Sequence, residues 1–224
     1  MPEADDRPAC PPGCGCSAGN EFGEGDARDD VRSYRKSGPT TTTRWLVDGL
    51  GAGGVEGLTV LDIGAGVGAA HQALLALGAA AATDIDVSPA YVAAAREEAE
   101  RLGTADRVRY EVGDFVTMAT AVEPADLVVL DRVICCYPDM PSLVRLSADR
   151  ARSRYGLVYP RDTWWLRAGA TVLNGLARLT RRRVRAYVHR SEAVDAIVRA
   201  AGFAPRLHRT SLYWRVAVYE RLPA

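Results

Sequence analysis

The sequence lacks the marks of an exported or membrane-spanning protein. Its first residues are acidic and rich in proline, without the apolar core of a secretory signal. No uninterrupted apolar stretch reaches the length that is needed to span a bilayer. Lysine is almost absent, since Lys36 is the only one in 224 residues. The five cysteines are an odd number and no export signal precedes them, so we expect reduced thiols and a cytoplasmic protein.

The formal net charge is zero, but positive and negative residues are unevenly distributed. Residues 1–139 carry 11 Lys+Arg and 23 Asp+Glu, a balance of −12, whereas residues 140–224 carry 17 and 5, a balance of +12. The two halves can attract each other within one fold. Alternatively, the basic half faces an anionic substrate, a membrane or nucleic acid. The length suits one α/β domain with an accessory segment.

The N-terminal residues 1–27 predict a flexible tail, because they hold four prolines, five glycines and no apolar periodicity. Cys10, Cys14 and Cys16 form a C-x3-C-x-C cluster within it. Thiolates at this spacing could bind zinc or an iron–sulfur cluster, but a four-coordinate site needs another ligand and no histidine is near. We therefore predict no metal centre and leave the role of these cysteines open.

The stretch from Leu58 to Gly68 predicts a nucleotide-binding element. Leu58 to Ile63 are mostly branched and apolar, as in a strand that is buried in a parallel sheet. Three glycines then alternate, and a run that suits a helix follows from Ala69 to Leu77. The glycines allow a tight turn and a close approach to a ligand, and the helix start offers unpaired N–H groups. Two classes of nucleotide cofactor, dinucleotides among them, use such a turn.

Acidic residues follow at the ends of successive predicted strands. Asp86 closes a second buried strand and is placed to accept hydrogen bonds from both hydroxyls of a ribose, with Asp84 as the alternative. Asp114 follows a third strand at 108–112, and Asp131 follows a fourth at 126–130. Ligands bind at this edge of open α/β sheets, so the segment from Asp131 to Pro138 is a candidate wall of the substrate site.

Further elements are expected on either side of these strands. Residues 28–50 predict two short helices broken at Gly38-Pro39, and residues 140–154 predict a helix with Arg154 facing outward. Residues 161–188 predict a helical insertion with an apolar stripe and many arginines. This insertion could pack against the sheet or a partner subunit, cover a bulky apolar substrate, or lie on a membrane surface. A helix at 191–201 and strands at 203–209 and 213–221 complete the chain.

The acid two residues before the first of three alternating glycines, Asp62-Ile63-Gly64-Ala65-Gly66-Val67-Gly68, resembles motif I of class I S-adenosylmethionine (SAM) methyltransferases. The resemblance implies a Rossmann-like, doubly wound α/β fold in three layers. Its seven-stranded sheet would be mainly parallel, with an antiparallel last strand. SAM would be the cofactor and S-adenosylhomocysteine the product. The cofactor-binding residues that the resemblance implies are Asp62, Gly64, Ala65, Gly66, Gly68, Asp86, Val87, Asp114, Phe115 and Asp131.

The string from Leu130 to Asp139 resembles the D-x-x-I-H-Y segment of magnesium protoporphyrin IX O-methyltransferases, and the resemblance covers roughly residues 30–222. Where that family has histidine, this chain has Cys135-Cys136 and is one residue longer, so the porphyrin substrate is not carried over. The alternative of a short-chain dehydrogenase fails, because its Tyr-x-x-x-Lys relay needs a lysine after the glycine turn. Lys36 precedes that turn.

We therefore expect a SAM-dependent methyltransferase domain over residues 28–224 that acts on a small molecule, for example in secondary metabolism, with O-methylation favoured over N- or C-methylation. The candidate catalytic residues are Tyr34, Asp131, Cys135, Tyr137 and His189. We expect no nucleic-acid partner and no stable membrane insertion, and a homodimer is compatible with the sequence.

Two other functions stay open at this point. One is a nucleic-acid or protein methyltransferase that uses the basic C-terminal half, although the Asn/Asp-Pro-Pro-Tyr/Phe signature of amino methylation is absent after the fourth strand. The other is a SAM-binding module without catalysis.

Overall fold

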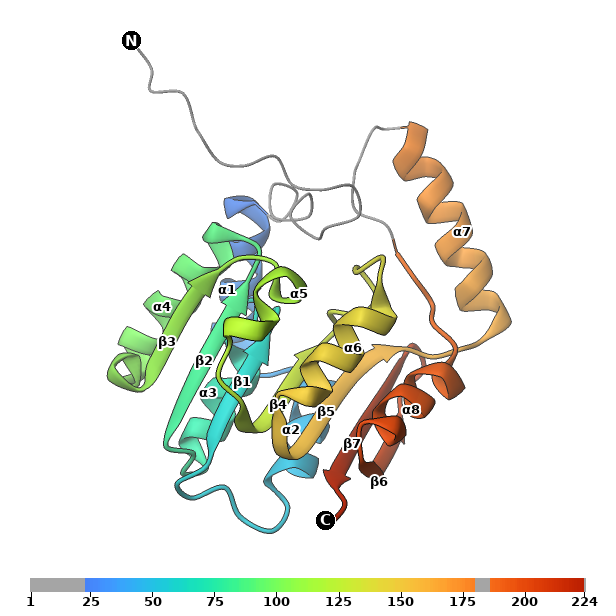
Figure 1. Cartoon of the computed structure of the whole chain (residues 1–224). Coiled ribbons are helices and arrows are strands. Elements are labelled where there is room, and N and C mark those ends of the chain that lie inside the picture. The colour runs from blue at the N-terminus through green and yellow to red at the C-terminus, as the bar shows by residue number, and fades with distance from the viewer. Residues whose placement is uncertain (1–22, 180–185, 224) are drawn as a thin grey trace.

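The computed structural model describes residues 23–179 and 186–223, and they form one seven-stranded sheet between helices (Figure 1). The strands are β1 (Thr59–Ile63), β2 (Ala81–Asp86), β3 (Val108–Val112), β4 (Ala125–Asp131), β5 (Ala151–Pro160), β6 (Phe203–Thr210) and β7 (Trp214–Arg221). Their order is β3-β2-β1-β4-β5-β7-β6. Only β7 runs antiparallel to its neighbours β5 and β6, which confirms the predicted sheet.

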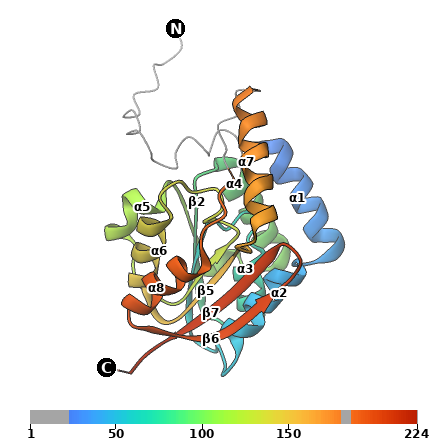
Figure 2. The same ribbon diagram turned by 90° about the vertical axis from the view of Figure 1, so that its right-hand side faces the viewer.

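Two helical layers cover the sheet, as both views of the molecule show (Figures 1 and 2). One face carries α2 (Thr41–Gly51), α3 (Ala69–Ala76) and α4 (Pro89–Leu102), with α1 (Glu24–Ser37) against α4. The opposite face carries α5 (Phe115–Met118), α6 (Met140–Asp149) and α8 (Ser191–Ala200). Successive side chains of β4 point to opposite faces of the sheet and so contribute to both hydrophobic layers. Leu127 packs on the first face and Val128 on the second, and both are fully buried.

Local sequence explains where several helices begin. The Thr40 hydroxyl accepts a hydrogen bond from the Thr43 N–H at the start of α2, and Ser88 accepts one from the Tyr91 N–H at the start of α4. Pro89 occupies the first turn of α4, where its missing N–H costs nothing. These caps fix the helix starts beside the carboxyl edge of the sheet.

Two boundaries differ from the sequence-based expectation. The helix α1 begins at Glu24, within the segment that was predicted as a tail, whereas Cys10, Cys14 and Cys16 lie outside the described residues. The helix α6 ends at Asp149, so Arg154 lies in β5 and not on a helix surface. Its buried guanidinium donates hydrogen bonds to the carbonyl oxygen of Leu50, in the last turn of α2, and to that of Gly54, in the loop that follows. The prediction that Arg154 faces outward was therefore wrong.

The helix α7 (Trp164–Leu179) stands beside the rest of the molecule and does not cover the sheet (Figures 1 and 2). Several of its large apolar side chains are exposed, including Trp164 and Leu173. None of the helices in the described part of the chain combines the length and the apolar character that crossing a membrane requires.

Candidate active site

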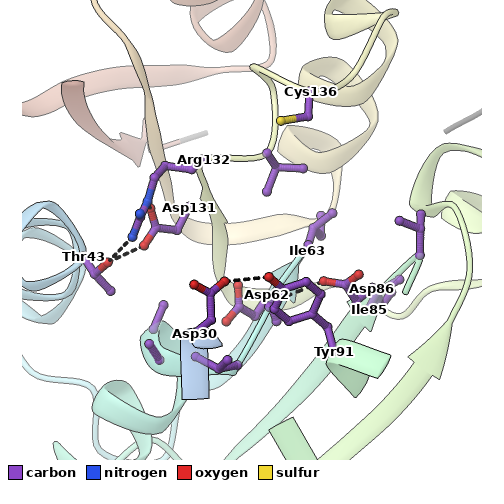
Figure 3. Close-up of a pocket in the computed structure, with 18 of the residues that line it drawn as sticks. Asp30, Thr43, Asp62, Ile63, Ile85, Asp86, Tyr91, Asp131, Arg132 and Cys136 are labelled. Atoms are coloured by element: carbon purple, nitrogen blue, oxygen red, sulfur yellow. Dashed lines mark hydrogen bonds and ion pairs between the residues drawn. The ribbon is translucent and has the colours of Figure 1, made fainter. Parts of the chain in front are cut away.

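A cavity of about 330 Å³ opens at the carboxyl ends of β1, β2 and β4 (Figure 3). Residues of α1 and α2, among them Tyr34 and Thr43, line it from the other side, so the N-terminal helices lie over the cavity. The predicted cofactor-binding residues that line the cavity are Asp62, Gly64, Ala65, Gly66, Asp86, Val87, Asp114, Phe115 and Asp131.

Gly68 is the one predicted cofactor residue that does not line the cavity, and its role is local. It has φ of 79° and caps the N-terminus of α3. A Cβ atom there would lie 2.6 Å from the ring of His71, so only glycine lets this ring pack under the loop. The sequence pattern identified the need for glycine but not the reason for it.

Gly64 is constrained by both its backbone and its neighbours. Its φ is 65°, and a Cβ would lie 2.7 Å from a methyl group of Val133. Its N–H donates to the carbonyl oxygen of Ile85 at 2.7 Å, which ties the loop to the end of β2. The turn thereby holds β1, β2 and the loop after β4 at one point of the sheet edge.

Asp62 forms a buried pair with His71 beneath the glycine turn. Its Oδ2 accepts a hydrogen bond from the His71 N–H at 3.3 Å and lies 3.0 Å from the ring Nδ1. Both side chains are buried, and the Oδ1 of Asp62 has no partner in the described part of the chain. A buried carboxylate oxygen without a partner is costly, so this atom is suited to receive the ammonium group of a bound amino acid moiety.

Asp86, and not Asp84, lies at the cavity (Figure 3). The two oxygens of Asp86 accept hydrogen bonds from the N–H groups of Gly66 at 3.0 Å and Ser88 at 2.8 Å, while burial raises the pKa of this carboxyl. Asp84 lies two residues earlier on the same face of β2, does not line the cavity and is fully buried. Burial first, and then the nearby Asp62 and Asp86, raise its pKa well above the usual range.

Tyr137, a candidate catalytic residue, hydrogen-bonds to Asp114, and this contact indicates a positioning role for Tyr137. The Tyr137 hydroxyl donates to the two carboxylate oxygens of Asp114 at 3.1 and 3.0 Å, and both side chains are buried. Asp114 also caps α5 by accepting from the Val116 N–H at 3.0 Å. Phe115 lies next to it in the cavity wall. A hydroxyl in this position orients a carboxylate and is poorly placed to move a proton of an acceptor.

Asp131 is also engaged on both oxygens. The Thr43 hydroxyl donates to its Oδ2 at 2.5 Å, and the Arg132 Nε–H donates to its Oδ1 at 3.1 Å (Figure 3). Arg132 has φ of 63° and is the only non-glycine residue with positive φ in the described ranges. Such a conformation is uncommon outside glycine and is concentrated at functional sites. Its guanidinium also donates to Thr40 at 3.1 Å, so the network joins β4 to the covering helix α2.

Of the two adjacent cysteines, the second lines the cavity and the first does not. Cys135 is buried and its thiol donates to the carbonyl oxygen of Arg132 at 3.1 Å, whereas Cys136 faces the cavity. The two sulfur atoms lie 3.7 Å apart. Hydrogen bonding between them raises the pKa of Cys135, with burial as a second cause, and lowers the pKa of Cys136. Cys136 is therefore the cysteine that could contact a substrate, in place of the predicted Cys135.

Of the candidate catalytic residues His189 and Tyr34, only Tyr34 lines the cavity. His189 does not line the cavity, because its Nε2 lies 2.8 Å from the carbonyl oxygen of Ile134 and its ring stacks on Tyr187 at 5.8 Å. Burial lowers its pKa, which favours the neutral ring. Tyr34 lines the cavity, but burial and then Glu98 raise its pKa, which disfavours the ionised form that could act as a base.

Sequence reasoning missed several residues of the cavity wall. The Tyr91 hydroxyl donates to Asp30 at 2.6 Å, which joins α4 to α1 across the cavity (Figure 3). Neither residue belongs to a motif, and only the spacing of Tyr91 after Ser88-Pro89 placed it near the sheet edge. Arg132 lies in the segment from Asp131 to Pro138 that was predicted as a wall of the substrate site, but it was not named as a site residue. Among the described residues, no group of three or more His, Cys, Asp or Glu side chains could hold a metal ion.

The geometry fits one class of protein. An unpartnered carboxylate oxygen, a glycine turn with no room for a Cβ atom at Gly64, and acids at the ends of three strands surround one cavity. Residues 60–152 match the family model of the methyltransferase domain. This match and the fold support a class I SAM-dependent methyltransferase, and the predictions of the fold, the enzyme class and SAM as cofactor are confirmed.

Similar proteins support this class. A 72-residue stretch is 46% identical to the ribosomal protein L11 methyltransferase of Enterobacter sp. (strain 638), over 31% of this chain and 23% of that protein, so the chain spans about a quarter of the curated relatives it matches. The crystal structure of magnesium protoporphyrin IX methyltransferase from Synechocystis PCC 6803 with bound S-adenosylhomocysteine has a TM-score of 0.71 at 24% identity, covering 92% of this chain and 98% of that one. An O-methyltransferase family protein from Burkholderia thailandensis has a TM-score of 0.65 at 18% identity, covering 92% and 61%.

Proposed function

We propose that this protein transfers the methyl group of SAM to an oxygen of a small, acidic acceptor molecule. In this proposal Asp62 binds the amino end of SAM, Asp86 the ribose, and Asp114 with Phe115 the adenine. The acceptor then occupies the part of the cavity between Tyr34, Arg132 and Cys136. The cover that α1 and α2 provide favours a small molecule over a macromolecule, because it leaves an enclosed space of limited volume.

One observation carries the choice of an acidic acceptor: Arg132 is the only cationic side chain among the described residues of the cavity wall. The groups that could act as a general base are poorly placed to remove a proton from the acceptor. Both carboxylate oxygens of Asp131 already accept hydrogen bonds, and His189 lies outside the cavity. Methyl transfer to an oxygen that is already ionised needs no strong base, only alignment with the sulfonium carbon. Arg132 can hold such an anion while its Nε–H stays on Asp131.

The experiment is an incubation of the purified protein with methyl-labelled SAM and an extract of its source cells, followed by separation of small molecules from macromolecules. We expect label in an acidic small molecule, released by mild base if it is an ester. Label in RNA, DNA or protein would contradict the proposal and favour the macromolecular alternative that the Enterobacter relative illustrates. SAM binding without any label would favour a non-catalytic module.

A matched pair of variants tests the role of Arg132. Its guanidinium lies 5.7 Å from the ring centroid of Trp214, and that of Arg209 lies 5.7 Å from the ring of Trp45, away from the cavity. We expect Arg132→Ala to lower labelling by about tenfold or more with SAM affinity retained, and Arg209→Ala to leave labelling unchanged. Equal labelling by the two variants would contradict the anion-binding role of Arg132.

The cytoplasmic location and a homodimer remain part of this proposal.

A further inference from the structure

The helix α7 has its apolar side turned away from the molecule. Along a helix, residues seven and four apart share one side, so Trp165, Val172 and Leu176 form one face and Asn174 lies opposite. Val172, Leu173 and Leu176 are 62%, 60% and 55% exposed. A helix that covers a core shows the reverse arrangement, with its apolar face buried.

The polar side of α7 is the side that is fastened to the protein. The Asn174 side chain donates to the carbonyl oxygen of Ala186 at 2.9 Å and accepts from the Ala186 N–H at 2.8 Å. The next residue, Tyr187, donates its N–H to the carbonyl oxygen of Cys135 at 2.7 Å. The orientation of α7 is therefore fixed by hydrogen bonds that leave its apolar face outward and reach the loop that carries Cys136.

Aromatic residues extend this apolar surface beyond α7. The ring of Trp165 packs edge-on against Tyr213 at 5.7 Å, and Tyr213 and its neighbour Leu212 are 52% and 63% exposed in the turn between β6 and β7. Trp164, at the start of α7, is 80% exposed. We call Trp164, Val172, Leu173, Leu176, Leu212 and Tyr213 the α7 surface. Tryptophan and tyrosine with leucine are the residues that anchor helices at the interface of a bilayer.

The charge of the sequence segment that contains α7 indicates the kind of partner. Between Asp162 and Glu192 the sequence contains seven arginines and no acidic residue. Of these, Arg167 pairs with Asp162 and Arg190 with Glu192, so the sequence of this segment, with both acids included, keeps an excess of five positive charges. A two-fold contact between copies would bring this basic segment against itself, because the same surface is used on both sides. An anionic lipid surface offers the opposite charge together with an apolar interior. We propose that α7 lies in the plane of an anionic membrane surface, with its apolar face inserted below the headgroups.

Vesicle flotation with the full chain tests this proposal, and its readout does not depend on methyl transfer. Vesicles of phosphatidylcholine with phosphatidylglycerol should bind the protein, pure phosphatidylcholine should bind it about tenfold less, and added salt should release it. Leu173→Glu should reduce binding to the mixed vesicles by roughly tenfold. The matched control is Leu102→Glu, which introduces the same charge at a leucine that is 42% exposed at the end of α4, and it should bind as the wild type does.

Three results would overturn the proposal. The first is the absence of binding to anionic vesicles, and the second is equal loss of binding in Leu173→Glu and Leu102→Glu. The third is a stable dimer in light scattering that Leu173→Glu dissociates while vesicle binding is unchanged, which would assign the α7 surface to a second copy. Circular dichroism of both variants verifies that they are folded.

Discussion

The two ends of the cavity are built in different ways. At the cofactor end, carboxylates and glycines at the ends of β1 and β2 are held by backbone N–H groups, as Asp86 is by Gly66 and Ser88. At the acceptor end, the wall consists of side chains that hold one another, as Thr43, Asp131 and Arg132 do. The first end is fixed by the fold itself, and the second by contacts between segments that are far apart in the sequence.

This difference explains what each end can tolerate. A backbone N–H is present whatever the side chain, so the geometry of the cofactor end depends on a few residues, namely the glycines and acids. A network of side chains can be changed one member at a time, which lets the acceptor end vary while the fold is kept. Changes at the first end should therefore affect stability and SAM binding together, and changes at the second should affect the acceptor alone.

The largest effect is expected from Gly64→Ala, compared with Gly103→Ala. Both glycines have positive φ, but a Cβ at Gly103 meets nothing within 4 Å, whereas one at Gly64 lies 2.7 Å from Val133. The shared backbone cost is about 1–2 kcal/mol, and the clash at Gly64 should add about 1–3 kcal/mol to the loss of unfolding free energy. Chemical denaturation of both variants measures the difference. Equal losses would show that the turn has room to move.

The same contrast decides how much the sequence could predict. The strands, the order of the acids and the antiparallel β7 were predictable, because buried parallel strands and a glycine turn leave a local pattern. The choice of Asp86 over Asp84 and of Cys136 over Cys135 needed the structure. The two acids share one face of β2 and differ in how near they lie to the end of the strand, and of the two adjacent cysteines only one lines the cavity. The contacts of His189 and Asn174 join segments that are distant in the sequence, so no local sequence pattern predicts them.

The sequence also could not predict which face of α7 is exposed. Its apolar stripe predicted an amphipathic helix, and packing against the sheet was one of the expectations. The structure shows the stripe exposed, with Asn174 on the attached side. Periodicity gives the faces of a helix but not which face meets the protein.

A smaller effect is expected from Tyr137→Phe, which tests whether this residue serves the cofactor or the chemistry. Removal of a hydroxyl that donates to a carboxylate should weaken SAM binding about tenfold through Asp114, with kcat nearly retained. Calorimetric titration and steady-state kinetics separate the two quantities. Tyr155→Phe is the control, since that buried hydroxyl bonds to Ser147 away from the cavity. A loss of kcat with unchanged SAM affinity would instead support the catalytic role that the sequence suggested.

The smallest effect is expected from Asp84→Asn, and it takes the form of a changed pH dependence. Because the folded pKa of Asp84 is raised, the folded state holds a proton that the unfolded state loses above its ordinary pKa of about 3.9. The wild type therefore loses stability from this group as the pH rises from that value to the folded pKa. The variant lacks this loss, so its melting temperature relative to the wild type should increase with pH. A constant difference would mean that Asp84 is ionised in the folded protein.

Calorimetric titration of SAM into the wild type, Asp86→Asn and Asp84→Asn tests whether this cavity is the SAM site. The two variants make the same chemical change two residues apart on one strand, and only Asp86 lines the cavity. We expect one SAM per chain for the wild type and for Asp84→Asn with similar affinity, and an affinity lower by about 30-fold or more for Asp86→Asn, which loses hydrogen bonds to a charged group. Equal affinity for Asp86→Asn and the wild type would contradict the assignment of this cavity to SAM.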